Sequence, residues 1–164
     1  MLSRIDHLGV AVGDLDAALT LYADVLGLEV EHREIVSEQG IEAVALRVGE
    51  SRIELLSPLT EDSPVGRFLA RRGPGLHHVA YVVEDLAAAL CVLGGAGVRL
   101  IDQTPRRGLG GCLIAFIHPA SAGGVLTELV QLPVQEQAGG VSPQAGPSSE
   151  HPSAGGEEKG ESDE

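Results

Sequence analysis

The sequence is poor in large aromatic residues, and this limits how its hydrophobic core can be built. Among 164 residues there is no tryptophan, and only two tyrosines and two phenylalanines are present. The core must therefore consist mainly of Leu, Val, Ile and Ala, which the chain contains in abundance. Its length suits one globular domain, or two small modules that share a core.

Cysteines and membrane signals are also scarce. Cys91 and Cys112 form no metal-binding spacing, and two thiols do not make the disulfide framework of a secreted protein. The opening residues MLSRIDHLG lack the pattern of a signal peptide. No apolar run approaches the ~18 residues that cross a bilayer. We therefore expect a cytoplasmic protein with reduced cysteines and no membrane segment.

Positive charge is the third deficit. The chain has 11 Lys and Arg against 24 Asp and Glu, which gives a formal net charge of −13. Such a chain cannot neutralise the phosphates along a nucleic-acid groove, so a nucleic-acid partner is not expected. Part of the negative charge lies in residues 134–164, a stretch rich in Gly, Ser, Pro and Glu. This composition predicts a disordered acidic tail that aids solubility.

What the sequence does contain is an internal repeat within residues 3–133. Placing His7 on His78 aligns DHLGVAVGDLDAAL with HHVAYVVEDLAAAL. Further along, the pattern RIELLSP is matched by LTELVQLP. Each unit therefore runs from a strand that begins with a histidine to a strand that carries a glutamate.

The local signals within each unit predict the order β-α-β-β-β. Asp14 and Asp85 stand where N-caps belong, before Leu- and Ala-rich helices expected over 15–26 and 86–95. Three strands should follow each helix, and those of the second unit are expected over 98–105, 112–119 and 125–132. We predict an α+β fold with module one at 3–60, a linker helix within 61–74 and module two at 75–133.

The histidines and glutamates of the repeat suggest a shared site. Strand alternation places His7 and His78 at equivalent positions of the two units, and it turns His77 toward the other face as a structural residue. Glu54 and Glu128 each lie inside an apolar strand, which is unfavourable for an unpartnered acid.

A pseudo-twofold axis would bring these two His and two Glu side chains around one metal ion. Imidazole nitrogen and carboxylate oxygen suit divalent Co, Mn, Zn or Ni. The alternative is that the histidines are hydrogen-bonded strand residues and that the glutamates lie on a solvated face. That alternative explains each residue singly, but it does not explain their symmetric placement.

At these residues the chain resembles the vicinal oxygen chelate superfamily, whose paired βαβββ modules form a half-barrel around a metal. Within it, the sequence is most similar to the methylmalonyl-CoA epimerase family. The resemblance covers nearly all of residues 5–132. It is carried by IDHLGVAV, EQGI at 38–41, IELLSP, GLHHVAYVVEDL and PRRGLGGCLIAFIHPASAGGVLTELVQ at 105–131.

The resemblance implies a metal-assisted isomerase acting on an acyl-CoA, with a divalent ion such as Co²⁺ and a homodimeric assembly. The implied metal ligands are His7, Glu54, His78 and Glu128. Glu128 would also act as a catalytic group that exchanges the proton of the substrate.

The resemblance also leaves part of the site open. The position of a second catalytic glutamate falls on Ala43, which leaves its neighbour Glu42 as the candidate. Arg106 and Arg107 are candidates for contacts with the coenzyme A phosphates.

Two other functions remain compatible with the same fold. One is glyoxalase I, a lyase that acts on a glutathione hemithioacetal and has a similar His and Glu set. The other is a metal-free module that sequesters small molecules, as the drug-resistance proteins of the superfamily do. Those proteins lack the four-ligand set, so metal analysis separates them from an enzyme.

Overall fold

The computed structural model describes residues 1–133, so the tail expected at 134–164 lies outside the described residues. Its strands form one eight-stranded sheet in the order β2-β3-β4-β1-β5-β8-β7-β6. No helix within residues 1–133 combines the length and the apolar character that a membrane crossing requires. In chain order the elements are β1 (Leu2–Ala11), α1 (Leu15–Leu19), β2 (Val30–Val36), β3 (Ile41–Val48), β4 (Ser51–Pro58), α2 (Pro64–Arg72), β5 (Gly75–Val83), α3 (Leu86–Gly95), β6 (Arg106–Arg107), β7 (Leu113–Ile117) and β8 (Thr127–Gln131).

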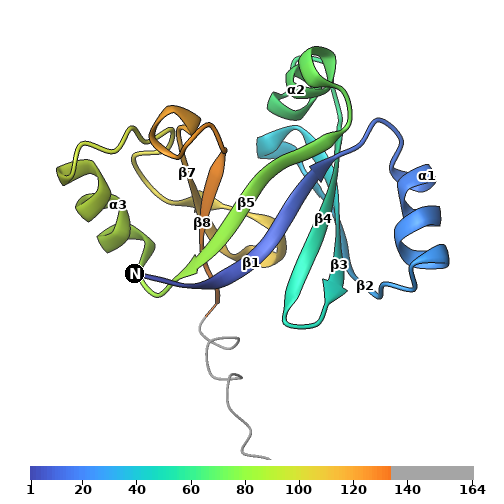
Figure 1. The fold of residues 1–164 in the computed structure, drawn as a ribbon, viewed down its shortest axis with the longest axis horizontal. Coiled ribbons are helices and arrows are strands. Elements are labelled where there is room, and N and C mark those ends of the chain that lie inside the picture. Colours follow the sequence, from blue (N-terminus) through green and yellow to red (C-terminus); the bar gives the residue numbers. More distant parts are fainter. Residues whose placement is uncertain (134–164) are drawn as a thin grey trace, which may run out of the picture.

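The two halves of the sheet have the same internal pairing. β1 is parallel to β4 in the first half, and β5 is parallel to β8 in the second. The antiparallel pair of β1 and β5 joins the halves at the centre of the sheet. Figure 1 shows α1 and α3 on opposite flanks of the curled sheet, with α2 near one end of the central strands. The predicted α+β class, with a half-barrel sheet, is confirmed.

The helices begin where the sequence places their caps. The Asp14 carboxylate accepts a hydrogen bond from the N–H of Ala17 at 2.9 Å, and Asp85 does the same for Ala88 at 2.8 Å. These bonds satisfy N–H groups that have no partner inside the helix. After α1 the chain continues through a wider, π-helical turn over Thr20–Val25.

One predicted strand is absent. The segment 98–105 contributes only an isolated bridge between Leu100 and Ile117, and strand β6 is confined to Arg106–Arg107. Here the side chain of Asp102 accepts the N–H of Phe116 at 2.8 Å, in place of a main-chain carbonyl. Such side-chain acceptors compete with regular ladders, and the neighbouring Pro105 has no N–H to donate. Only part of a ladder therefore forms: the N–H of Ile101 donates to the main-chain oxygen of Phe116 at 2.8 Å, and that of His118 donates to the main-chain oxygen of Arg99 at 2.9 Å.

The outer face of each half is covered by its own helix. Leu15 of α1 packs with Leu46 and Leu55 of the first half, and Leu86 of α3 packs with Leu129 of the second. Because these helices lie outside, the inner faces of both halves remain free to enclose a site.

The ladder between β1 and β5 is irregular beside both histidines of the repeat. Ile5 pairs with Tyr81 and His7 with Ala80, so Asp6 is an extra residue on β1. On the other strand, Gly9 pairs with His78 and Val10 with Leu76, so His77 is the extra residue. A bulge of this kind breaks the alternation of side chains and can turn neighbouring residues toward one face.

A candidate metal centre

Glu128 and His7 are aligned by a row of residues across three strands. Glu128 of β8 pairs with Ala80 of β5, and Ala80 pairs with His7 of β1. The carboxylate Oε2 of Glu128 lies 3.2 Å from Nε2 of His7 and 2.8 Å from Nε2 of His78. A single acid of the second half thus contacts both histidines.

A matching row aligns Glu54 and His78. Glu54 of β4 pairs with Gly9 of β1, and Gly9 pairs with His78 of β5. Glu54 Oε2 lies 3.5 Å from Nε2 of His7. A Cβ atom at Gly9 would lie 2.2 Å from Cε1 of the His78 ring. The glycine therefore provides the space that the His78 ring occupies.

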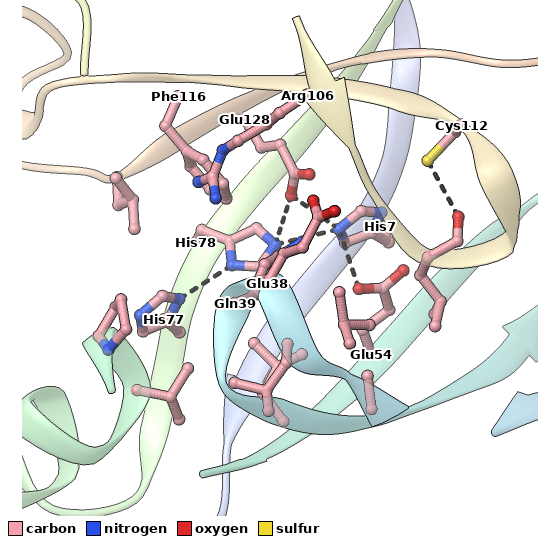
Figure 2. Close-up of a pocket in the computed structure, with 18 of the residues that line it drawn as sticks. His7, Glu38, Gln39, Glu54, His77, His78, Arg106, Cys112, Phe116 and Glu128 are labelled. Atoms are coloured by element: carbon pink, nitrogen blue, oxygen red, sulfur yellow. Dashed lines mark hydrogen bonds and ion pairs between the residues drawn. The ribbon is translucent and has the colours of Figure 1, made fainter. Parts of the chain in front are cut away.

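The four predicted ligands converge on one point, as Figure 2 shows. The Nε2 atoms of His7 and His78 are 3.0 Å apart, and ligand atoms of His7, Glu54 and His78 all lie within 4.8 Å of one another. Ligands held about 2.1 Å from one ion at right angles are separated by about 3 Å. His7 is 3% exposed, and His78 and Glu128 are each 4% exposed. Two imidazoles and two carboxylates in this arrangement fit a divalent metal ion.

The close packing of these buried side chains shifts their pKa values. Burial opposes a protonated His7, but the carboxylates of Glu54, Asp6 and Glu128 outweigh it and raise the pKa of His7 well above its usual value. Burial alone would raise the pKa of Glu128, but His78 and His7 hold that pKa below the usual range. Burial raises the pKa of Glu54. The cluster therefore attracts positive charge, which a proton or a divalent ion can supply.

The residue that precedes each histidine ligand holds its ring in place. Asp6 Oδ2 lies 2.9 Å from Nδ1 of His7, and Nδ1 of His77 lies 3.0 Å from Nδ1 of His78. Asp6 is buried and also accepts a hydrogen bond from Arg52 at 3.2 Å. Each contact engages Nδ1 and leaves Nε2 directed at the centre.

The position of His77 differs from the expectation that it faces away from the site. It lines the same pocket as the ligands, and its ring packs edge-on against Phe68 at a centroid distance of 5.0 Å. The cause is the bulge at His77, which interrupts strand alternation at this residue. Burial, followed by the neighbouring His78, lowers the pKa of His77 to about 4, so its ring is neutral.

The cluster forms the floor of a cavity of about 180 Å³. Its walls are partly apolar, with Ile41, Leu56 and Phe116, and partly polar. Sequence reasoning missed two of the polar residues, Glu38 and Gln39, which lie in the turn Ser37–Gln39 before β3. The only signal for them was the EQG motif itself.

Glu42 is not brought to this cavity. Ala43 is buried and lines the cavity, whereas the Glu42 carboxylate accepts a hydrogen bond from Nε of Arg33 at 2.8 Å on the other face. The register between β3 and β4 runs without interruption from Ile41 to Val48, so no bulge in this ladder turns Glu42 inward.

The two arginines of β6 occupy different environments. The Arg106 guanidinium lies over the Phe116 ring at 5.4 Å, and its Nε is 3.1 Å from an oxygen of Asp102. It lines the cavity beside Glu128 (Figure 2). Arg107 is exposed and does not line it. Among residues 1–133, Arg106 is thus the one arginine that lines the cavity beside the candidate metal ligands.

Comparison with known proteins places this geometry in context. The model of the Glyoxalase/Bleomycin resistance protein/Dioxygenase superfamily matches residues 6–116. The ethylmalonyl-CoA/methylmalonyl-CoA epimerase of Cereibacter sphaeroides is 37% identical over 134 residues, which cover 80% of this chain and 100% of that protein.

Solved structures show the same similarity. The methylmalonyl-CoA epimerase of Mycobacterium tuberculosis superposes with a TM-score of 0.79 at 44% identity, over 84% of this chain and 93% of the other. A variant of the Streptomyces coelicolor methylmalonyl-CoA epimerase, in complex with 2-nitronate-propionyl-CoA, gives a TM-score of 0.78 at 43% identity. That match covers 80% of this chain and 95% of the other.

Proposed function

Because this chain belongs to the Glyoxalase/Bleomycin resistance protein/Dioxygenase superfamily, we propose that it is a methylmalonyl-CoA epimerase, an isomerase that interconverts the two C2 epimers of methylmalonyl-CoA. The observation that carries the proposal is the buried cluster of two His and two Glu at the floor of a small cavity. Support comes from relatives of that name and from a related structure that contains an acyl-CoA analogue.

The reaction requires removal of the proton on C2 and its return on the opposite face. Negative charge then builds up on the thioester oxygen, and its stabilisation is the main requirement of the site. A divalent ion held by His7, Glu54, His78 and Glu128 would supply Lewis acidity toward the thioester and carboxylate oxygens. Arg106 directs a further positive charge into the cavity, where it can orient the substrate carboxylate.

We assign the proton transfers to two carboxylates of the cavity. Glu128 lies at its floor, between the two histidines. Glu38 lies in the turn before β3 and lines the same cavity. It takes the part that the sequence suggested for Glu42, whose carboxylate is engaged by Arg33. Glu128 is buried against the apolar wall, which limits water near it, whereas Glu38 is exposed at the rim of the cavity, where it can exchange its proton with solvent between turnovers.

Deuterium exchange at C2 of methylmalonyl-CoA tests this assignment. We expect Glu128→Gln and Glu38→Gln each to slow exchange by about 100-fold or more, since a positioned acid or base contributes that much. Glu38→Gln should retain the metal content of the wild type. Glu84→Gln serves as the control, because Glu84 is exposed at the end of β5. Wild-type exchange in Glu38→Gln together with a large loss in Glu42→Gln would return the role to Glu42.

Three finer features belong to the same proposal. We expect Co²⁺ to be the ion that supports activity best, with Mn²⁺, Zn²⁺ and Ni²⁺ as alternatives that suit the same donors. We expect a homodimer, in keeping with the resemblance in sequence. We expect a cytoplasmic protein, since Cys91 and Cys112 are both free thiols. Metal analysis and light scattering of the purified protein test the first two features.

A further inference from the structure

A second cavity adjoins the metal pocket. It is a groove of about 590 Å³ between α2 and the segment 119–126 that leads into β8. Pro64, His77 and Leu126 line both this groove and the metal pocket. A ligand whose reacting end occupies the metal pocket can therefore extend past these three residues into the groove.

The groove is positively charged in a chain that is otherwise strongly acidic. Arg67, Arg71 and Arg72 line it, and their spacing places them on one side of α2. Arg67 donates to the main-chain oxygen of Asp62, and Arg71 Nε donates to that of Arg67 at 3.1 Å. The Arg72 guanidinium lies 6.0 Å from the centre of the Phe68 ring.

These three arginines differ from most others of the protein in their partners. Arg33, Arg47, Arg52 and Arg106 each form an ion pair with a carboxylate. Within residues 1–133, none of the three arginines of α2 does so. Unpaired guanidinium groups that face a groove match a phosphate-bearing ligand. Phe68, Leu76 and Val125 add an apolar surface to the same groove.

We propose that this arginine groove binds the phosphate-bearing nucleotide end of the acyl-CoA substrate. The pantetheine arm then passes His77 and Leu126 and delivers the thioester to the metal pocket. The inference rests on the proposed function, because it deepens the identity of that substrate. It also moves the phosphate contacts away from β6: Arg106 lies inside the metal pocket, and Arg107 lines neither cavity.

The test compares two substrates that differ only in the nucleotide. Methylmalonyl-CoA and methylmalonyl-pantetheine are assayed with the wild type and with the double variant Arg71→Glu/Arg72→Glu. We expect the KM for methylmalonyl-CoA to rise about tenfold or more, since charge-assisted contacts to phosphate are lost. The KM for methylmalonyl-pantetheine and both kcat values should stay within about twofold of wild type, because the reacting end of the substrate is bound elsewhere. The control is Arg4→Glu, which reverses one exposed charge on β1.

Direct binding separates failure of this inference from failure of the proposed function. Calorimetry with adenosine 3′,5′-bisphosphate should show binding to the wild type and to Arg4→Glu, and a loss in the double variant. If binding follows this pattern while neither thioester is epimerised, the groove stands as a nucleotide site and the proposed function fails. If both thioesters are epimerised with equal KM in the wild type and the double variant, the inference is overturned and the function stands. An equal rise in KM for both thioesters, or a larger effect of Arg107→Glu, also overturns it.

Discussion

At the scale of single residues, Asp6 shows how a side chain outside the metal cluster can control it. Its carboxylate meets Nδ1 of His7 at 2.9 Å, and it also accepts a hydrogen bond from Arg52. The bond to Nδ1 keeps the Nε2 lone pair of His7 directed toward the ion and makes the ring a better donor.

We therefore predict that Asp6→Asn weakens divalent metal binding by about tenfold or more, in the range seen when partners of metal ligands are changed. The substitution preserves the size of the side chain but removes its charge. Competition with a metallochromic indicator measures the affinity. The unfolding temperature of the metal-free variant serves as a check on its folding. An unchanged affinity in a folded variant would show that Asp6 does not position His7.

The two cysteines provide a pH-dependent contrast at the same scale. Cys91 is exposed, whereas Cys112 lines the metal pocket and donates to the main-chain oxygen of Leu109 at 3.0 Å. Burial, followed by the nearby Glu128 and Glu54, raises the pKa of Cys112 to about 12. Because only the thiolate reacts readily, Cys112 should remain an inert thiol throughout the neutral and mildly alkaline range.

We predict that iodoacetamide at pH 8.5, close to the unperturbed thiol pKa of about 8.5, modifies Cys91 and leaves Cys112 largely unmodified. Peptide mass spectrometry measures both sites in the same sample, so each thiol is a control for the other. Unfolding in urea should abolish the difference. Equal alkylation of both cysteines in the folded protein would contradict the raised pKa.

At the scale of elements, the site depends on how closely β1 approaches the His78 ring. Gly9 stands between Glu54 and His78 in the second row of residues, where a Cβ would clash with the ring. We predict that Gly9→Ala displaces His78 and lowers metal affinity by at least as much as Asp6→Asn. Gly13→Ala is the matched control, because a Cβ at Gly13 meets no atom within 4 Å. Metal content after dialysis measures the effect, and wild-type content in Gly9→Ala would contradict it.

The elements also show which features the sequence could predict. The repeat was sufficient to place His7, Glu54, His78 and Glu128 at equivalent positions, because period-two alternation is local. The bulge at His77 was not predictable in this way, since an extra residue is defined only by the partner strand. Alternation therefore assigned His77 to the wrong face.

The strand expected at 98–105 failed for a similar reason. Its apolar pattern is local, but the bond from Phe116 to the Asp102 side chain joins residues that are distant in the sequence. Glu38 was not proposed as a site residue, because a polar turn gives no periodic signal. Its place in the cavity depends on how the turn before β3 folds over the sheet.

At the scale of the whole molecule, the candidate metal centre lies where the two halves meet. His7 and Glu54 come from β1 and β4, and His78 and Glu128 come from β5 and β8. An ion bound there links the halves of the sheet through side chains as well as through the ladder between β1 and β5. A ligand that binds only the folded state stabilises that state.

We predict that a divalent ion at 100 times its dissociation constant raises the free energy of unfolding by about 2.7 kcal/mol. Thermal unfolding with added Co²⁺ and with a chelator measures the shift in Tm. His7→Ala and His78→Ala should each abolish the shift, although they remove ligands from different halves. His118→Ala is a suitable control, because His118 lies outside the metal pocket. A shift that survives loss of either ligand would place the ion elsewhere.

The two histidine ligands have unlike partners at Nδ1, so the charge around the metal centre does not follow the symmetry of the two halves. Asp6 and His77 occupy matching bulges beside His7 and His78, yet one is a buried carboxylate and the other a neutral ring. The imidazole of the first half is therefore the stronger electron donor, and the two sides of the centre are chemically unlike. A substrate bound at this centre therefore meets a different imidazole donor on each side, although the two halves share one backbone pattern.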